Sequence, residues 1–390
     1  MTALPQGFSA AGVAAGLKLS GSADLGILLT DRPAAVAGVF TTNRYAAPPV
    51  LVTKRHVRRG SARAIVVNSG NANACTGEQG LRDARAMARI GARHLSVKTH
   101  EVLVASTGVI GQVLDMGAVE AGIAKAAPNL SISGAADFAR CIMTTDTRPK
   151  TAAAEVGGAR IVGFAKGAGM MAPEMATMLA FVATDAPVPS VVLQEALRGA
   201  VMPSFNMLNL DACMSTNDTV LVLANGAVGG SEIEPDSTRA RAFADALADV
   251  CSSLARQIAD DGEGMTKLVS IVIRGARNEV EARRAGHAIA NSVLLRCALN
   301  GSDPYWGRVL AALGAAPIAF DPNKIDVWMG GEQLCARGTF GPGDVAKARA
   351  ALQQRNVEIV VDMHRGDATG TVLTNDLSVE YVKFNTEYTT

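Results

Sequence analysis

The stretch 166-KGAGMMAPEMATMLAFVA-183 joins a loop broken by glycine and proline to a short apolar run. Gly167, Gly169 and Pro173 disfavour a regular helix before Thr177, because glycine adds backbone freedom and proline lacks a donor. The apolar run 178–183 predicts a buried strand. Thr177 therefore stands where a loop enters a strand, which is where a hidden N-terminal nucleophile would lie. Cleavage of the preceding bond would give it a free α-amine beside its hydroxyl, a base and a nucleophile in one residue. A purely structural Ala-Thr pair is the alternative from these residues alone.

The surrounding chain predicts a mixed α/β protein, because short apolar runs alternate with helical patterns. We expect strands at 64–67, 101–106, 161–165, 178–183, 219–224, 267–274 and 357–362. We expect helices at 81–94, 135–143, 239–260 and 279–291. The strand expected at 101–106 should end where Thr107-Gly108 breaks it.

The charge balance argues against several classes of partner. The 390 residues carry 37 basic and 36 acidic side chains, a formal net charge of +1. A chain this close to neutrality has no basic field for nucleic acid. Aromatic residues make up only 4% of it, which disfavours a base-stacking platform.

Cysteine usage and the N-terminus point to the cytoplasm. The six cysteines are scattered and form no CxxC pair, so we expect reduced thiols. The N-terminus lacks the order of a signal peptide. No apolar run approaches the roughly 20 residues that a membrane helix needs, so we expect no membrane partner.

The residues available for catalysis favour a mechanism without histidine. The five histidines lie in no catalytic motif, and neither G-x-S-x-G nor H-E-x-x-H occurs. A triad of distant residues stays open. An N-terminal threonine supplies its own base, because an α-amine has a pKa near ~8. Asp260, Asp261 and Glu263 lack the alternation of a calcium loop, so we expect no metal.

Further blocks extend the pattern beyond Thr177. The stretch 166–179 resembles the self-cleavage segment of the ornithine acetyltransferase family, the bifunctional glutamate N-acetyltransferases. Eight more blocks resemble that family in its own order: 38-GVFTTN-43, 67-VNSGNAN-73, 105-ASTGVIG-111, 143-MTTDTRPK-150, 215-STNDT-219, 261-DGEG-264, 302-SDPYWGR-308 and 385-NTEYTT-390. The resemblance covers nearly the whole chain.

The resemblance implies a fold and a reaction. The fold would be α/β, with helices layered on β-sheets, cut between Ala176 and Thr177 into an α subunit (1–176) and a β subunit (177–390) that stay together as an α2β2 assembly. The reaction would move an acetyl group from N-acetylornithine to glutamate through an acyl-Thr177 intermediate without a cofactor. It would serve arginine biosynthesis or a related specialised pathway.

The resemblance also implies roles for single residues. Thr177 would be the nucleophile, and the Thr107 hydroxyl and Gly108 N–H would form the oxyanion hole. Lys166 would bind the substrate carboxylate, where a cation suits an anion, and Glu263 a substrate amino group. The remaining substrate contacts would be Thr144 or Thr145, Asn385 and Thr390. Taken alone, each of these residues also fits an ordinary turn, a solvated loop or a frayed chain end.

One segment departs from the family pattern. In 204-SFNMLNLDACM-214 an expected acidic residue is Cys213, and Met207 and Met214 add apolar character. This segment either lines the pocket, which would alter the substrate, or packs in the core. Two rival functions stay open: a self-cleaving amidohydrolase or aminopeptidase that passes the acyl group to water, and a non-catalytic ligand-binding relative.

Overall fold

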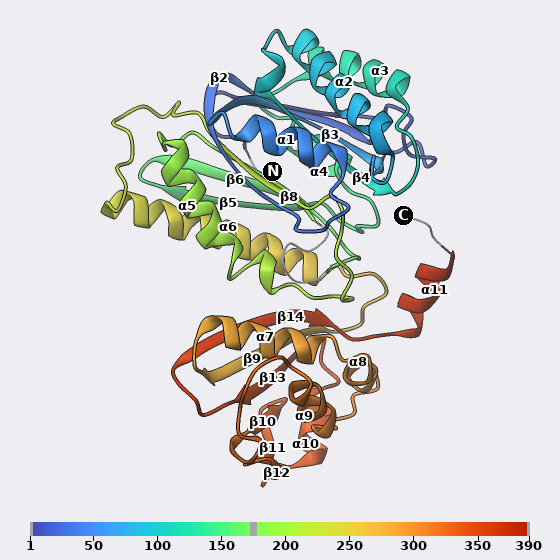
Figure 1. The fold of residues 1–390 in the computed structure, drawn as a ribbon, viewed down its shortest axis with the longest axis vertical. Coiled ribbons are helices and arrows are strands. Elements are labelled where there is room, and N and C mark those ends of the chain that lie inside the picture. Colours follow the sequence, from blue (N-terminus) through green and yellow to red (C-terminus); the bar gives the residue numbers. More distant parts are fainter. Residues whose placement is uncertain (1–2, 172–177, 388–390) are drawn as a thin grey trace.

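The computed structural model describes residues 3–171 and 178–387, and Figure 1 shows two lobes joined by few crossings of the chain. The first lobe is built on an eight-stranded sheet with the order β4-β3-β2-β8-β7-β6-β5, in which β1 pairs with β2. Its strands are β1 (Phe8–Val13), β2 (Leu25–Phe40), β3 (Ser61–Asn71), β4 (Val102–Val109), β5 (Lys150–Val156), β6 (Ala159–Lys166), β7 (Leu179–Thr184) and β8 (Thr219–Ala224).

Helices cover this sheet. They are α1 (Pro48–Val57), α2 (Gly77–Leu95), α3 (Met116–Ala126), α4 (Ala135–Cys141), α5 (Ser190–Val201) and α6 (Thr238–Ala259), with single-turn helices η1 (Thr99–Glu101), η2 (Ala127–Asn129) and η3 (Phe205–Met207). In Figure 1, α2 and α3 lie on one side of the lobe and α5 and α6 on the other. The layered α/β fold expected from the sequence is thus confirmed.

The two faces of the sheet in the first lobe pack into separate hydrophobic cores. Ile161 of β6 packs with α5 and α6, whereas Phe164 of the same strand enters an inner core shared with β3 and β8. Phe138 of α4 completes that inner core, with its ring edge-on to Phe164 and Phe181 at centroid distances of 5.2 and 5.8 Å. Because β7 is covered on both faces, all of its residues are buried and its sequence is continuously apolar.

The second lobe carries a six-stranded sheet with the order β12-β11-β10-β13-β9-β14. Its strands are β9 (Leu268–Ala276), β10 (Asp326–Met329), β11 (Glu332–Ala336), β12 (Thr339–Phe340), β13 (Asn356–Asp362) and β14 (Ala368–Asn375). Its helices are α7 (Glu279–Ala290), α8 (Val293–Asn300), α9 (Gly307–Gly314), α10 (Val345–Ala351) and the single turn η4 (Pro322–Lys324). The last helix, α11 (Val379–Glu387), leaves β14 and returns towards the first lobe (Figure 1).

Most expected elements are present, with two differences that matter for the site. The expected strand at 219–224 is β8, and the expected helix at 239–260 is α6. The expected break at Thr107-Gly108 is wrong, because β4 continues to Val109 and keeps pairing with the end of β3. The 16-residue strand β2 was not predicted. No described helix is long and apolar enough to cross a membrane.

Candidate active site

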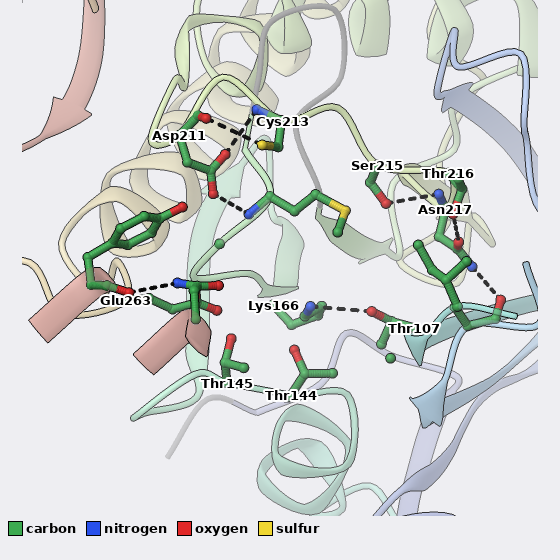
Figure 2. Close-up of a pocket in the computed structure, with 17 residues that line it drawn as sticks. Thr107, Thr144, Thr145, Lys166, Asp211, Cys213, Ser215, Thr216, Asn217 and Glu263 are labelled. Carbon is green, nitrogen blue, oxygen red and sulfur yellow. Dashed lines mark hydrogen bonds between the residues drawn. The ribbon is translucent and has the colours of Figure 1, made fainter. Parts of the chain in front are cut away.

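One cavity, lined by the first lobe, the loop after α6 and helix α11, brings together every predicted site residue that the structure describes. Its walls include Thr107, Gly108, Thr144, Thr145, Lys166, Glu263 and Asn385. Figure 2 shows Lys166 between Thr107 and Glu263, with Thr144 and Thr145 on one side and Asp211 and Cys213 on the opposite side. Ala176, Thr177 and Thr390 lie outside the described residues.

The end of β4 requires glycine at position 108. Gly108 has φ +132°, and a Cβ atom there would lie 2.3 Å from the carbonyl carbon of Gly70. This close approach follows from the parallel pairing of β4 with β3, whose last residues run alongside Thr107 and Gly108. A side chain at this position would have to displace backbone, so the glycine fixes the N–H that is predicted to stabilise an oxyanion.

Asn217 clamps the loop ends around this turn, although its role was not predicted from the sequence. Its buried side-chain amide donates to the carbonyl of Ala72 at 2.7 Å and to that of Ser106 at 2.8 Å. Thr216 Oγ1 donates to Asn217 Oδ1 at 2.5 Å. The block 215-STNDT-219 belongs to the family resemblance, but only the fold places it against Ser106, the residue before Thr107.

Lys166 is buried at the end of β6, with 3% of its surface exposed. Its Nζ donates to Thr107 Oγ1 at 3.3 Å. Burial lowers the pKa of Lys166, and the nearby charges of Asp146 and Glu263 partly oppose this effect. Because burial disfavours the charged form, a bound anion would stabilise the ammonium form of Lys166.

A network of buried charges holds the loop beneath Lys166. Lys150 Nζ donates to Asp146 Oδ1 and to Asp261 Oδ2, each at 2.6 Å. Asp146 also accepts the N–H of Gly167 at 2.7 Å and that of Thr144 at 2.9 Å. Burial alone would raise the pKa of Asp146, but Lys166, Lys150 and the Gly167 N–H together lower it. Asp146 therefore ties the loop that carries Thr144 to the segment that follows Lys166.

Glu263 reaches the cavity from the loop that follows α6. Its N–H donates to the Ala168 carbonyl at 3.0 Å, which ties this loop to the segment after Lys166. Asn385 of α11 donates to Glu263 Oε2 at 3.2 Å. A Cβ at Gly169 would lie 2.4 Å from that carboxylate, so a side chain there would displace the Glu263 carboxylate from its place in the cavity.

Asp260, Asp261 and Glu263 do not converge on a metal. The carboxylate of Asp260 binds Arg148 and Arg355, Asp261 binds Lys150, and Glu263 faces the cavity. Among the described residues, no group of three acidic, histidine or cysteine side chains is arranged to hold a metal ion.

The segment that departs from the family pattern divides between cavity and core. Asp211 and Cys213 line the cavity, whereas Met207 packs in the core of the second lobe. The carbonyl of Met214 accepts from Asn43 Nδ2 at 3.1 Å. Burial and the charge of Asp211 raise the pKa of the Cys213 thiol, which makes it a neutral part of the wall.

Asp211 anchors the loop that follows Lys166. Its Oδ2 accepts the N–H of Met170 at 2.5 Å, and its Oδ1 accepts that of Met171 at 2.7 Å. Met170 has φ +56°, an unusual value for a residue with a side chain. Asp211 therefore holds a strained turn just before residue 172. Tyr381, a further lining residue, was also not predicted.

Comparison with known proteins identifies the family of the chain that carries this cavity. The ArgJ family model matches residues 9–390. The arginine biosynthesis bifunctional protein ArgJ of Symbiobacterium thermophilum is 49% identical over 99% of this chain and 98% of its own, and that of Geobacter sulfurreducens is 44% identical over 99% of both chains. A crystal structure of the Bacillus halodurans protein of the same name is 34% identical with a TM-score of 0.51, and covers 52% of this chain and 96% of its own. The chain therefore belongs to the ArgJ family.

Proposed function

We propose that this protein is an ornithine acetyltransferase that moves an acetyl group from N-acetylornithine to glutamate in arginine biosynthesis. The observation that carries the proposal is the convergence of seven predicted site residues from both sides of residue 177 on one cavity. The names of its relatives, which link them to arginine biosynthesis, support the same conclusion.

The proposed reaction has two halves. Thr177 Oγ attacks the acetyl carbonyl, and the α-amine of the same residue takes up the hydroxyl proton. The tetrahedral intermediate then collapses: the C–N bond breaks, the departing ornithine nitrogen receives that proton, and an acetyl ester remains on Thr177. The amine of glutamate attacks this ester, loses a proton to the α-amine, and leaves as N-acetylglutamate while Thr177 Oγ regains the proton. The acyl group is stored on the protein, so the reaction as proposed uses no cofactor.

The oxyanion of each intermediate would be held by Thr107 and Gly108. Lys166 Nζ donates to Thr107 Oγ1, which occupies a lone pair of that oxygen and leaves its O–H to donate elsewhere. The Gly108 N–H is fixed by the close contact of β4 with β3. Donors that are already oriented stabilise the developing charge without reorganisation.

Substrate binding would use the charges across the cavity. Glu263 suits the ammonium group of an amino acid, and Lys166 suits a carboxylate. Thr144 and Thr145 both line the cavity, so each can donate to a bound carboxylate. Asn385 would orient Glu263 from α11, and Thr390 is proposed to contribute at the same end.

The proposed nucleophile requires cleavage between Ala176 and Thr177. The two fragments, 1–176 and 177–390, would stay together and form an α2β2 assembly. One observation supports the division: 96% of the Bacillus halodurans chain aligns with 52% of this one, so that chain is close to half as long. A cytoplasmic location is supported by the six cysteines, which are all free thiols.

A donor and acceptor screen with mass readout tests the function. The native chain should yield a fragment that begins at Thr177 and should convert N-acetylornithine and glutamate into ornithine and N-acetylglutamate. Thr177→Ala should lose cleavage and transfer, whereas Thr177→Ser should retain part of each. Release of free acetate in place of N-acetylglutamate would show a hydrolase. Binding of ornithine without cleavage or turnover would show a non-catalytic relative.

A further inference from the structure

A second cavity, in the first lobe, concentrates positive charge. It has a volume of about 490 Å³ and lies between α1, α2 and η1. It shares no lining residue with the candidate active site. Of the eleven described residues that line it, none is acidic and six are basic: Arg55, His56, Arg59, Arg85, Arg89 and His100. In a chain with a net charge of only +1, such a composition is a local feature of this cavity.

The four arginines of this cavity lack the partners that other arginines nearby have. Within residues 3–171 and 178–387, none of the four guanidinium groups forms an ion pair. Two other arginines of α2 do, because Arg82 pairs with Glu78 at 3.6 Å and Arg93 pairs with Glu120 of α3. The cavity therefore holds positive charge that the described part of the protein leaves without a counter-charge.

The basic groups act on one another across the cavity. Burial lowers the pKa of His56, and the charges of His100, Arg59 and Arg55 lower it further, against the hydrogen bond to the Val102 carbonyl. A cation that is disfavoured by its neighbours marks a place of positive potential, which an anion would relieve.

Helix structure explains only part of this cluster. Cations are favoured near the C-terminal end of a helix, which accounts for Arg55 and His56 in the last turn of α1. It does not account for Arg85 and Arg89, which lie inside α2. These two are four residues apart, a spacing at which like charges destabilise a helix.

The α1 wall of the cavity is fixed to the sheet. Thr53 Oγ1 donates to the Val104 carbonyl at 2.6 Å and accepts the Val104 N–H at 2.8 Å. His56 Nδ1 donates to the Val102 carbonyl at 2.8 Å. Both partners belong to β4, the last strand at one end of the sheet order. A site whose walls are held in place loses little conformational entropy when a ligand binds.

We propose that this cavity binds a small molecule that carries two or more phosphate groups. Guanidinium groups pair bidentately with phosphate oxygens, and four of them converge here from two segments of the chain. One phosphate group carries a charge of about −2 at most, so a single group would leave much of this positive charge uncompensated. The cavity volume also lies in the usual range of small-molecule sites, roughly 300–1,000 Å³.

Other polyanions fit this cavity less well. No phenylalanine, tyrosine or tryptophan is among its described lining residues, which disfavours a nucleic-acid strand that would stack its bases. A symmetric contact between two copies of the chain would set arginines against arginines. The inference does not depend on the proposed acetyl transfer.

The test is isothermal titration calorimetry of the full chain with tripolyphosphate at about 0.15 M salt, where long-range attraction is screened. We expect saturable binding by the native chain. A variant with both Arg85→Gln and Arg89→Gln should bind more weakly by at least ~10-fold for each charge-assisted hydrogen bond that is lost.

A variant with both Arg82→Gln and Arg93→Gln is the matched control. It removes the same charge from the same helix, but neither residue lines the cavity. The ion pairs that it breaks are exposed, and exposed pairs contribute little to stability. It should bind tripolyphosphate with the native affinity. Circular dichroism reports whether each variant is folded.

Several results would overturn the proposal. One is a native chain that shows no saturable binding, and another is equal weakening in both double variants, because net charge alone would then explain the affinity. A third is a chain that ignores tripolyphosphate but binds a single-stranded oligonucleotide or anionic lipid vesicles through Arg85 and Arg89. A change in oligomeric state of the Arg85→Gln, Arg89→Gln variant in sedimentation, without a change in affinity, would assign the cavity to an interface between copies.

Discussion

Replacement of Asn217 by alanine should damage catalysis more than its cost in stability explains. The Asn217 amide binds two buried backbone carbonyls, those of Ala72 and Ser106, and alanine would leave both without this donor. Each buried acceptor that loses its partner costs about 1–3 kcal/mol, so we expect the free energy of unfolding to fall by roughly 2–6 kcal/mol. Because Ser106 directly precedes Thr107, the oxyanion donors should also shift. One misplaced donor lowers kcat by about 100-fold.

Asn225→Ala provides the comparison, because Asn225 follows β8 just as Asn217 precedes it. It is 7% exposed against 6% for Asn217, and its amide donates to the Gln6 carbonyl at 2.9 Å and to Thr30 Oγ1 at 3.0 Å. This variant should lose a similar free energy of unfolding but keep kcat.

The measurements are urea unfolding and steady-state acetyl transfer from N-acetylornithine to glutamate, with kcat and KM determined separately. An Asn217→Ala variant with unchanged kcat would refute the clamp. Equal losses of kcat in both variants would also refute it, because the effect would then be general loosening of β8.

Three further outcomes are expected. Gly108→Ala should lower kcat by about 100-fold or more and should also lower the thermal midpoint, since the added methyl group meets the Gly70 backbone at the oxyanion hole; full activity would contradict this. Glu263→Gln should raise KM for the amino-acid substrates by roughly 10- to 100-fold, because a charge-assisted hydrogen bond is lost; an unchanged KM would remove Glu263 from substrate binding. Burial lowers the pKa of His287 to about 4, so the folded protein favours the neutral imidazole. The free energy of unfolding should therefore fall as pH drops from 6.5 towards 4, by roughly 2–3 kcal/mol at pH 4.5. In His287→Gln, the urea midpoint should depend less steeply on pH over this range.

The sequence predicted best the strands that are buried on both faces of the sheet. β7 and β8 are covered on both faces, so their continuous apolar runs identified them within a residue. The sequence pattern did not predict β2, because the middle of this strand carries Asp31, Arg32 and Pro33. Its pairing with β3 also shifts register between Leu29 and Ala34. A proline at an irregularity hides a strand from any pattern of alternation.

The site was predictable only through the resemblance. Thr107, Lys166 and Glu263 lie far apart in the sequence, and nothing in their spacing shows that they share a cavity. The residues that support them were missed for the same reason: Asn217 and Asp211 act on backbone atoms of distant segments, and such contacts leave no local pattern.

The strand order of the first lobe has a consequence for how the cut protein would survive unfolding. Lys166 at the end of β6 pairs directly with Leu179 at the start of β7, and β8 pairs with β2. Under the proposed cleavage, neighbouring strands of one sheet would thus belong to two chains. The sheet forms once as a first-order event within a single polypeptide, but rebuilding it afterwards would be a second-order encounter of two pieces. Recovery after denaturation would then depend on protein concentration, and the mature protein would persist through slow unfolding more than through ready refolding.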